Sequence, residues 1–351
     1  MLRLVEWIRA TAARDFPDDV ALVVLYGSHV TRTAGPHSDI DCFFVPRTER
    51  GLAFARTFII DGIGYDIFPL RWERVEGLAD LREPLMPLLG DSVVLHAASP
   101  AEEARFLGLR ARLQANLADE ELTHHRAVER LGRARARWDG TAALDDVGRL
   151  RTQAGLVALE LAQAVAFANG TYFHHGPKRL IDDLAGLSTP SGFLPLFLGL
   201  AAAPDAGAVL DRTGALLAAT ARFLEDDDAG SAPPLPARGA AVVDVHTLAH
   251  VYEEISSSFT KVRVACDAGD PVAAFLAAVL LQDCLDDEVP VAVGLPGLLE
   301  AHDPADLSRL RSRLDAAEAT LVRAIESGGA VIERYPDLGA FLAAQRHDAV
   351  S

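Results

Sequence analysis

The sequence is poor in cysteine. Its 351 residues include only Cys42, Cys266 and Cys284, an odd number without clustering. A disulfide framework or a cysteine-based zinc site needs paired or closely spaced cysteines, so the sequence argues against both. We therefore expect a protein of the reducing cytoplasm.

Basic residues are outnumbered by acidic ones. The chain has 33 Lys and Arg against 50 Asp and Glu, which gives a net charge of -17. A nucleic-acid binder needs a basic surface to displace counterions, and an anionic membrane attracts basic segments. The charge therefore argues against both kinds of partner, and it is compatible with a small or cationic one.

Long apolar runs are missing as well. The longest, PVAAFLAAVLL at 271–281, is shorter than the about 20 residues that span a bilayer, and it predicts a buried helix. The N-terminal segment MLRLVEWIRATAARDF is interrupted by Arg3, Glu6 and Arg9. This pattern predicts an amphipathic helix and lacks the apolar centre of a signal peptide.

Half of the residues are hydrophobic, and the length suits two or three domains. The first 98 residues alternate between strand and turn signals. Asp61-Gly62 between two apolar runs is a strong hairpin signal. We predict a small mixed sheet with helices, an α/β domain over 1–98, whose strands are expected at 20–26, 39–46, 54–60, 63–69 and 92–97.

The pattern changes after Pro100, because helical periodicity replaces the strand signals. Asn169-Gly170 is a plausible helix stop. The segment DDDAGSAPPLPARGA, 226–240, is the clearest linker. We predict an all-α region in which a helical acceptor-binding domain over 99–228 is followed by a linker at 229–240 and a C-terminal helical domain at 241–351. Helices are expected at 101–137, 146–168, 178–186, 206–225, 242–285, 303–326 and 335–346.

Two acids stand one residue apart at the start of the second strand, Asp39 and Asp41 in DIDCFFVP. Alternation along a strand would point both to one face, and Ile40 and Cys42 to the other. Neighbouring carboxylates resist ionisation unless a cation lies between them, and oxygen ligands suit Mg²⁺. Asp66, in the second strand of the hairpin, can join them if the two strands are neighbours. The competing interpretation is a solvated strand end.

Gly27-Ser28 closes the first strand. Glycine lets a backbone approach a phosphate closely, and Ser28 is a good N-cap for a short helix over 29–33. The free N–H groups of a helix N-terminus, together with the serine hydroxyl, would bind phosphate oxygens. The competing interpretation is a plain turn and helix cap.

Together these residues resemble the nucleotidyltransferase superfamily of the DNA polymerase β type. The resemblance rests on Tyr26-Gly27-Ser28, on Ser38-Asp39-Ile40-Asp41 and on Asp66, over about residues 20–70. His29-Val30-Thr31-Arg32 departs from the small-residue and Arg-Gly pattern often seen between the two motifs. The superfamily implies that Asp39, Asp41 and Asp66 bind two Mg²⁺ ions, and that Gly27 and Ser28 hold the β- and γ-phosphates of a nucleoside triphosphate.

The order of an α/β domain followed by helices resembles the kanamycin nucleotidyltransferase-like group. The patch AVAFANGTYFHHGPKRL, 164–180, adds to this resemblance. It implies transfer of a nucleoside monophosphate, AMP from ATP, to a hydroxyl of a small molecule such as an aminoglycoside, with release of pyrophosphate. Glu160 is then the candidate general base, and Lys178 and Arg179 are candidates for binding phosphate. The group also suggests a homodimer.

Other interpretations stay open. Small members of the superfamily act as antitoxins that modify a protein, although this chain is much longer than they are. A non-enzymatic accessory protein is the third hypothesis, with the helices of 242–346 binding a partner. His246 and His250 have the spacing of zinc ligands on a helix. The residue directly after His246 is not a glutamate, so the zinc-protease motif H-E-x-x-H is incomplete.

Overall fold

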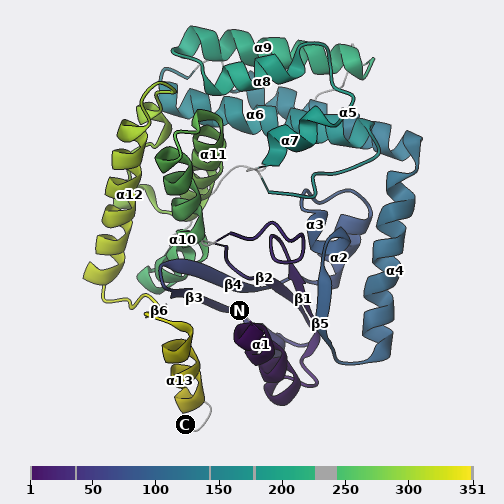
Figure 1. Ribbon diagram of the computed structural model, residues 1–351, viewed down its shortest axis with the longest axis vertical. Coiled ribbons are helices and arrows are strands. Elements are labelled where there is room, and N and C mark those ends of the chain that lie inside the picture. The colour runs from purple at the N-terminus through teal and green to yellow at the C-terminus, as the bar shows by residue number, and fades with distance from the viewer. Residues whose placement is uncertain (1, 36–37, 142–143, 177–178, 226–242, 349–351) are drawn as a thin grey trace. The chain divides into compact units, whose positions relative to one another are not determined.

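The computed structural model describes residues 2–35, 38–141, 144–176, 179–225 and 243–348 (Figure 1). Two compact units divide the chain. The first combines residues 1–116 with the short segment 252–257 and with 331–351, and the second consists of 117–251 and 258–330. The predicted linker at 229–240 lies outside the described residues. The four-part division at residues 98, 228 and 240 stays a prediction.

A six-stranded mixed sheet forms the centre of the first unit, in the order β5-β1-β2-β4-β3-β6. Both neighbours of β1, which are β2 and β5, run antiparallel to it, while β2 and β4 are parallel. The hairpin strands β3 and β4 are antiparallel, and β3 and β6 are parallel. The strands are β1 (Val20–Tyr26), β2 (Asp41–Pro46), β3 (Arg56–Ile60), β4 (Ile63–Pro69), β5 (Val93–Ala97) and β6 (Arg334–Tyr335).

The predicted hairpin is confirmed. Ile60 pairs with Ile63 across the turn, and Asp61 and Gly62 both have positive φ, at 52° and 74°. A two-residue turn with both φ values positive matches the right-handed twist of the strands that it joins. The local sequence therefore determines the register of β3 against β4.

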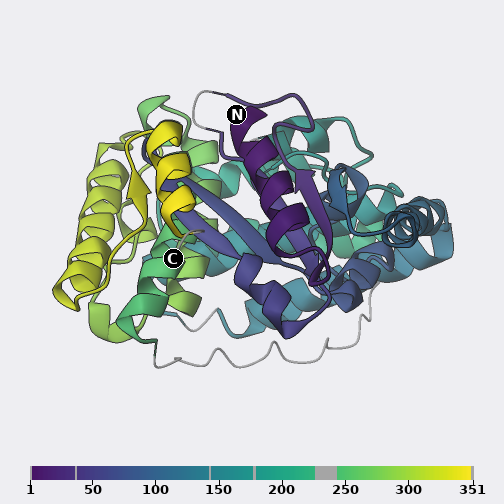
Figure 2. The ribbon, with the colours of Figure 1, turned by 90° about the horizontal axis from the view of Figure 1, so that it is seen from below.

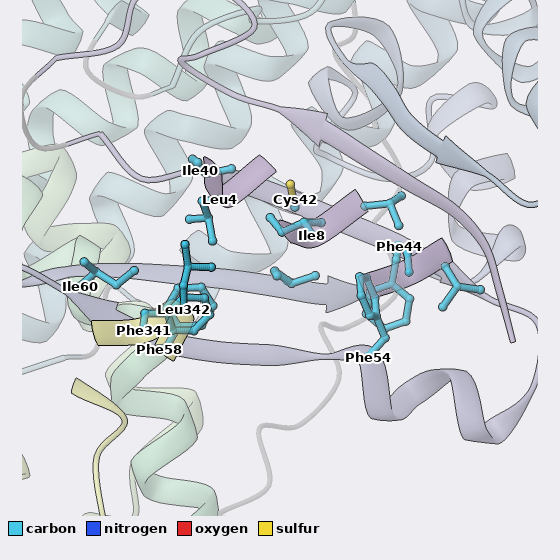
Figure 3. Close-up of a cluster of buried hydrophobic side chains, with 14 residues drawn as sticks. Leu4, Ile8, Ile40, Cys42, Phe44, Phe54, Phe58, Ile60, Phe341 and Leu342 are labelled. Atoms are coloured by element: carbon cyan, nitrogen blue, oxygen red, sulfur yellow. The ribbon is translucent and has the colours of Figure 1, made fainter. Parts of the chain in front are cut away.

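One face of this sheet packs against two helices that are far apart in the sequence, α1 (Leu2–Asp15) and α13 (Leu338–Asp348). Figure 2 shows α1 and α13 side by side on this face. The shared core contains Leu4 and Ile8 of α1, alternate residues of the strands, and Phe341 of α13 (Figure 3). The sheet of the first unit is therefore covered on this face by segments from both ends of its sequence.

Aromatic contacts fix α13 onto this core. The ring of Phe341 stacks on Phe58 of β3 with 4.2 Å between centroids, and it meets Trp7 of α1 edge-on at 5.0 Å. Paired aromatic rings contribute about 0.5–1.5 kcal/mol beyond the area they bury. Helix α13 is therefore part of the core of the first unit.

The opposite face of the sheet carries a second aromatic cluster. Tyr26 of β1, Phe43 of β2 and Phe68 of β4 lie 6.2–6.3 Å apart by ring centroids. Phe106 of α4 (Pro100–Leu117) covers Phe43 at 6.4 Å. The other short helices of the unit are α2 (Trp72–Ala79), α3 (Pro87–Gly90) and the 3₁₀ helix η1 (Glu49–Phe54).

Part of α10 (Val245–Asp267) also belongs to the first unit, through its segment 252–257. A Cβ added to Gly64 of β4 would lie 2.1 Å from Ser256 Oγ and 2.7 Å from the carbonyl oxygen of Glu253. The missing side chain at position 64 therefore lets this turn of α10 approach the strand closely.

The described part of the second unit is helical, as predicted, with differences at the boundaries. The expected helix at 101–137 is divided, because Asp119 caps the N-terminus of α5 and accepts a hydrogen bond from Leu122 N at 3.0 Å. Gly170 has φ +64° just after α6, which confirms the expected helix stop. Helix α8 has no counterpart among the expected helices. The helices are α5 (Glu120–Asp139), α6 (Val147–Ala168), α7 (Leu180–Ala185), α8 (Phe193–Ala201), α9 (Ala206–Phe223), α11 (Pro271–Glu288), η3 (Val291–Val293), η4 (Leu299–Ala301) and α12 (Ser308–Ser327).

Candidate active site

Polar side chains form a row across the sheet on the face opposite α1 and α13. Asp41 of β2 is the register partner of Asp66 in β4, and Asp66 is the register partner of Thr57 in β3. On the other side, Asp41 is paired with Tyr26 of β1. Neighbouring strands lie about 4.8 Å apart, so Asp41 and Asp66 are adjacent. The condition under which Asp66 can join Asp41, that their strands are neighbours, is met.

Asp39 reaches this site differently from the prediction. Strand β2 begins at Asp41, so Asp39 lies in the preceding loop and strand alternation does not orient it. Burial is the main cause that raises the pKa of two phenols, Tyr26 and Tyr65, and the negative charge of Asp39 raises both further. Asp39 thus precedes β2 by two residues, at the end of the sheet where Asp41 pairs with Tyr26.

The negative charges of the row raise the pKa values of neighbouring groups. Burial, followed by the charges of Glu254 and Asp41, raises the pKa of Asp66 to about 7. Burial and the charges of Asp41 and Asp66 raise the pKa of the Cys42 thiol to about 12. Cys42 and Ile40 are buried on the core face, as the alternation predicts. A cation beside Asp66 would oppose these effects and favour its ionised form.

Gly27 makes room for Asp41. Its φ of +79° is in the left-handed region, and a Cβ added there would lie 2.0 Å from Oδ2 of Asp41. Only glycine satisfies both conditions without strain. The Gly-Ser motif therefore has a direct structural link to the carboxylate row, because the glycine determines where the Asp41 carboxylate can lie.

Ser28 follows in a tight turn. The hydroxyl oxygen of Ser28 is buried and has no hydrogen-bond partner among the residues that the structure describes. A buried hydroxyl without a partner costs about 1–3 kcal/mol, so a ligand oxygen there would recover that cost. The predicted short helix over 29–33 is wrong: these residues form turns, in which Val30 and Thr31 donate to the carbonyl of Gly27 at 3.0 and 3.1 Å.

These residues fit a divalent metal ion that is shared with a phosphate ligand. Mg²⁺ takes one or two protein carboxylates together with phosphate oxygens, and Asp41 with Asp66 supplies such a pair. Within the described ranges, no group of three or more His, Cys, Asp or Glu side chains is arranged to hold a metal ion by itself. The three-carboxylate site with two ions stays a prediction.

The predicted residues of the helical region lie in the second unit. Oε2 of Glu160 in α6 accepts a hydrogen bond from Nη1 of Arg130 at 3.1 Å, and the Arg130 side chain is only 6% exposed. Arg179 faces Asp182 at 3.5 Å, and both side chains are exposed. Lys178 lies outside the described residues. The catalytic role of Glu160 and the phosphate-binding roles of Lys178 and Arg179 stay predictions.

Glu254 of α10 is a further acid of the first unit, and it was not a candidate from the sequence. Glu254 of α10 is exposed, and its charge affects Asp66 more strongly than that of Asp41 does. The only sequence signal is a pair of acids, Glu253-Glu254, in a helix of mixed polarity. Nothing in that pattern indicates that this helical turn packs against a strand far earlier in the chain.

Comparison with known proteins agrees with this geometry. Residues 5–79 match the family model described as a nucleotidyltransferase domain. The matched range contains Gly27, Ser28, Asp39, Asp41 and Asp66. Residues 5–79 are therefore a nucleotidyltransferase domain, and the candidate site lies within it.

Similarity to other known proteins is low. No curated protein matches the chain. Among solved structures, the chain matches a nucleotidyltransferase-like protein from Exiguobacterium sibiricum 255-15, with 9% identity and a TM-score of 0.37. The match covers 83% of this chain and 92% of the other. No helix among the described residues is long and apolar enough to cross a membrane.

Proposed function

We propose that the protein transfers AMP from ATP to a hydroxyl group of a small molecule, in a Mg²⁺-dependent reaction that releases pyrophosphate. The observation that carries the proposal is the register of Asp41 beside Asp66, with Gly27 shaped around the Asp41 carboxylate. Two adjacent carboxylates of which one has its pKa raised to about 7 are poorly suited to stability alone. They are well suited to a cation that arrives with a triphosphate.

The three aspartates and Ser28 have separate roles in this proposed reaction. Asp41 and Asp66 would hold the metal, and Asp39, at the end of the sheet, would be the third metal-binding carboxylate. The Ser28 hydroxyl would donate a hydrogen bond to a β- or γ-phosphate oxygen, which gives this buried group a partner. When bound, Mg²⁺ neutralises phosphate charge and activates the attacking oxygen.

The aromatic cluster of Tyr26, Phe43 and Phe68 supports the same face. Asp41 and Phe43 are two residues apart on β2, as are Asp66 and Phe68 on β4, so both pairs share one face of the sheet. The rings therefore place apolar surface next to the carboxylates along both strands. Electrostatic attraction between a metal ion and carboxylates is stronger where water is excluded.

The acceptor is proposed to be a hydroxylated amine of the aminoglycoside type. The net charge of -17 supports a cationic acceptor by general attraction. A protein substrate is the alternative, and the experiment below separates it from a small molecule.

The test is a matrix of donors and acceptors. The purified full chain is incubated with Mg²⁺ and each α-labelled nucleoside triphosphate, with kanamycin, glucose, adenosine or no added acceptor. We expect pyrophosphate release with ATP, a labelled kanamycin product, and loss of both signals with excess EDTA. Label on a polypeptide instead would contradict a small-molecule acceptor, and pyrophosphate release that persists in EDTA would contradict the role of the metal.

A further inference from the structure

The turn of α10 that lies on the sheet is fixed by a buried glutamate. Glu253 is 1% exposed, and its two carboxylate oxygens accept hydrogen bonds from two different segments. Oε2 accepts from the hydroxyl of Thr57 in β3 at 2.8 Å, and Oε1 accepts from the backbone N–H of Glu333 at 2.6 Å. One buried side chain thus joins this turn to two segments that are distant in the sequence, so the turn is firmly held.

Contacts at Gly64 and Tyr252 also define where this turn lies. Gly64 of β4 lets the helix backbone approach closely. The hydroxyl of Tyr252 accepts a hydrogen bond from Arg334 at 3.3 Å, and the same guanidinium makes a cation–π contact with the ring. The contacts of Glu253 and Gly64 are on the same sheet face as the carboxylate row, because Thr57 is the register partner of Asp66. Gly64 and Asp66 are two residues apart on β4 and share that face.

This anchoring determines the place of the next residue. Successive helical residues are rotated by about 100°, so Glu254 cannot share the direction of Glu253 toward Thr57. Glu254 is exposed, and it follows Glu253 on the helical turn that lies against Thr57 and Gly64. An accessible carboxylate is thus held on the turn that covers the sheet face of Asp41 and Asp66.

We propose that Glu254 is a catalytic residue that contacts the acceptor, and that Glu253 is the residue that positions it. Glu254 accepts a hydrogen bond from the acceptor hydroxyl and receives its proton during transfer. The acceptor O–H bond breaks as the new bond from that oxygen to the α-phosphorus forms. The bond between the α-phosphorus and the bridging oxygen breaks, and its electron pair leaves with pyrophosphate. This inference rests on the proposed nucleotidyl transfer.

The first test compares Glu254→Gln with Glu254→Asp and with a matched control, Glu73→Gln, at an exposed position of α2. The assay is pyrophosphate release from Mg-ATP with kanamycin or with water as the acceptor. Removing a positioned acid–base group typically lowers rates by about 10²–10⁴-fold. We expect Glu254→Gln to lose kcat in this range, Glu254→Asp to recover part of it, and Glu73→Gln to match the wild type.

Binding must be separated from turnover. Calorimetry with Mg²⁺ and α,β-methylene-ATP at pH 8, where Asp66 is largely ionised in both proteins, should show that Glu254→Gln still binds the nucleotide, since the proposed role lies on the acceptor side. Wild-type kcat in Glu254→Gln would overturn the inference. If Asp41→Asn is inactive in the same assay, the proposed function survives that result; if Asp41→Asn is also fully active, the proposed function fails too.

The positioning role has its own test. Glu253→Ala should lower kcat without changing the affinity for the ATP analogue, and Glu253→Gln, which keeps hydrogen-bonding atoms at both ends of its amide, should restore much of the rate. Thr57→Val removes one of the two hydrogen-bond partners and should give a smaller loss. Folding is checked by circular dichroism. A folded Glu253→Ala variant with wild-type kcat would contradict the positioning role.

Discussion

The two faces of the sheet in the first unit are built from the same strands and serve opposite purposes. On one face, Cys42, Phe44 and Phe58 pack against α1 and α13 and are at most 2% exposed. On the other face, Asp41, Asp66 and Thr57 stand in register, one strand apart. The difference shows how alternation along a strand allows a stable core and a charged site to be separated by the thickness of one sheet.

The largest expected effect comes from the charged face. Asp41→Asn should lower pyrophosphate release by about a thousandfold, because it removes one of the charges proposed to hold the metal. The fold should be retained, since the substitution is nearly isosteric and relieves repulsion with Asp66. The assay is kcat with Mg-ATP, alongside the midpoint of denaturant unfolding.

Asp61→Asn is the matched control for that variant. It makes the same chemical change in the exposed hairpin turn, where asparagine tolerates the positive φ. We expect wild-type activity. Equal losses in both variants would show that the effect of Asp41→Asn is not specific to the row.

The core face should respond in stability instead. Phe44→Ala removes a fully buried ring that packs edge-on against Phe54 at 5.0 Å. We expect a loss of about 3–5 kcal/mol in the free energy of unfolding, measured in urea. The folded fraction should keep its kcat. Leu2→Ala, at a side chain that is 79% exposed, should change stability little.

Gly27 lies against the Asp41 carboxylate, and Gly62 is its control because both glycines have positive φ. Both have positive φ, so alanine at either position costs about 1–2 kcal/mol in backbone strain. At Gly27 the new Cβ collides with Asp41, whereas no atom of the described residues lies within 4 Å of a Cβ at Gly62. Misplacing a reacting group by about 1 Å can cost about 100-fold in rate. We therefore expect Gly27→Ala to lose activity and Gly62→Ala to keep it, at similar melting temperatures.

A further difference concerns the pH dependence of the metal-free protein. Burial and the charges of Glu254 and Asp41 raise the pKa of Asp66 to about 7 in the folded state, above its unfolded value near 3.8. Between these values the folded state binds more protons, so the stability contributed by protonated Asp66 is lost as the pH rises from about 4 to 7. The melting temperature of Asp66→Asn relative to wild type should therefore rise over this range and level off above it.

Metal binding should show the matching trend. A proton on Asp66 competes with Mg²⁺, so Mg²⁺ affinity measured by calorimetry should increase from about pH 6 to about pH 8. The same affinity in Asp66→Asn should be weak and nearly independent of pH. A flat wild-type profile would mean that Asp66 is not a ligand.

Much of the first unit follows from local sequence. The apolar run of 20–26 predicts β1, and Asp61-Gly62 predicts the hairpin and with it the register of Thr57 against Asp66. Asp41 and Asp66 could be named as candidates because each acid interrupts a clear strand pattern, but their pairing across β2 and β4 was only a condition of the sequence argument. The serine after β1 predicts a helix cap, but the segment that follows it is too short to propagate a helix.

The contribution of distant segments could not be predicted. Strand β6 has two residues, Arg334 and Tyr335, and a pair of residues has no periodicity to detect. The periodicity of 335–346 predicts a helix in a separate helical domain, yet the structure places Phe341 in the core of the first unit. Glu254 reaches the row only because α10 packs against Gly64. Such long-range packing is decided by tertiary contacts, which a local pattern does not contain.

The pairing of β6 with β3 has a consequence for how the protein is made. Ile59 leaves the ribosome long before its partner Arg334 and the stacking ring of Phe341 are synthesised. Until then the edge of β3 is unpaired, and part of the core beneath it is exposed to solvent. Exposed strand edges and apolar surface favour aggregation during synthesis. The first unit is therefore completed only after the helical region that interrupts it has been translated.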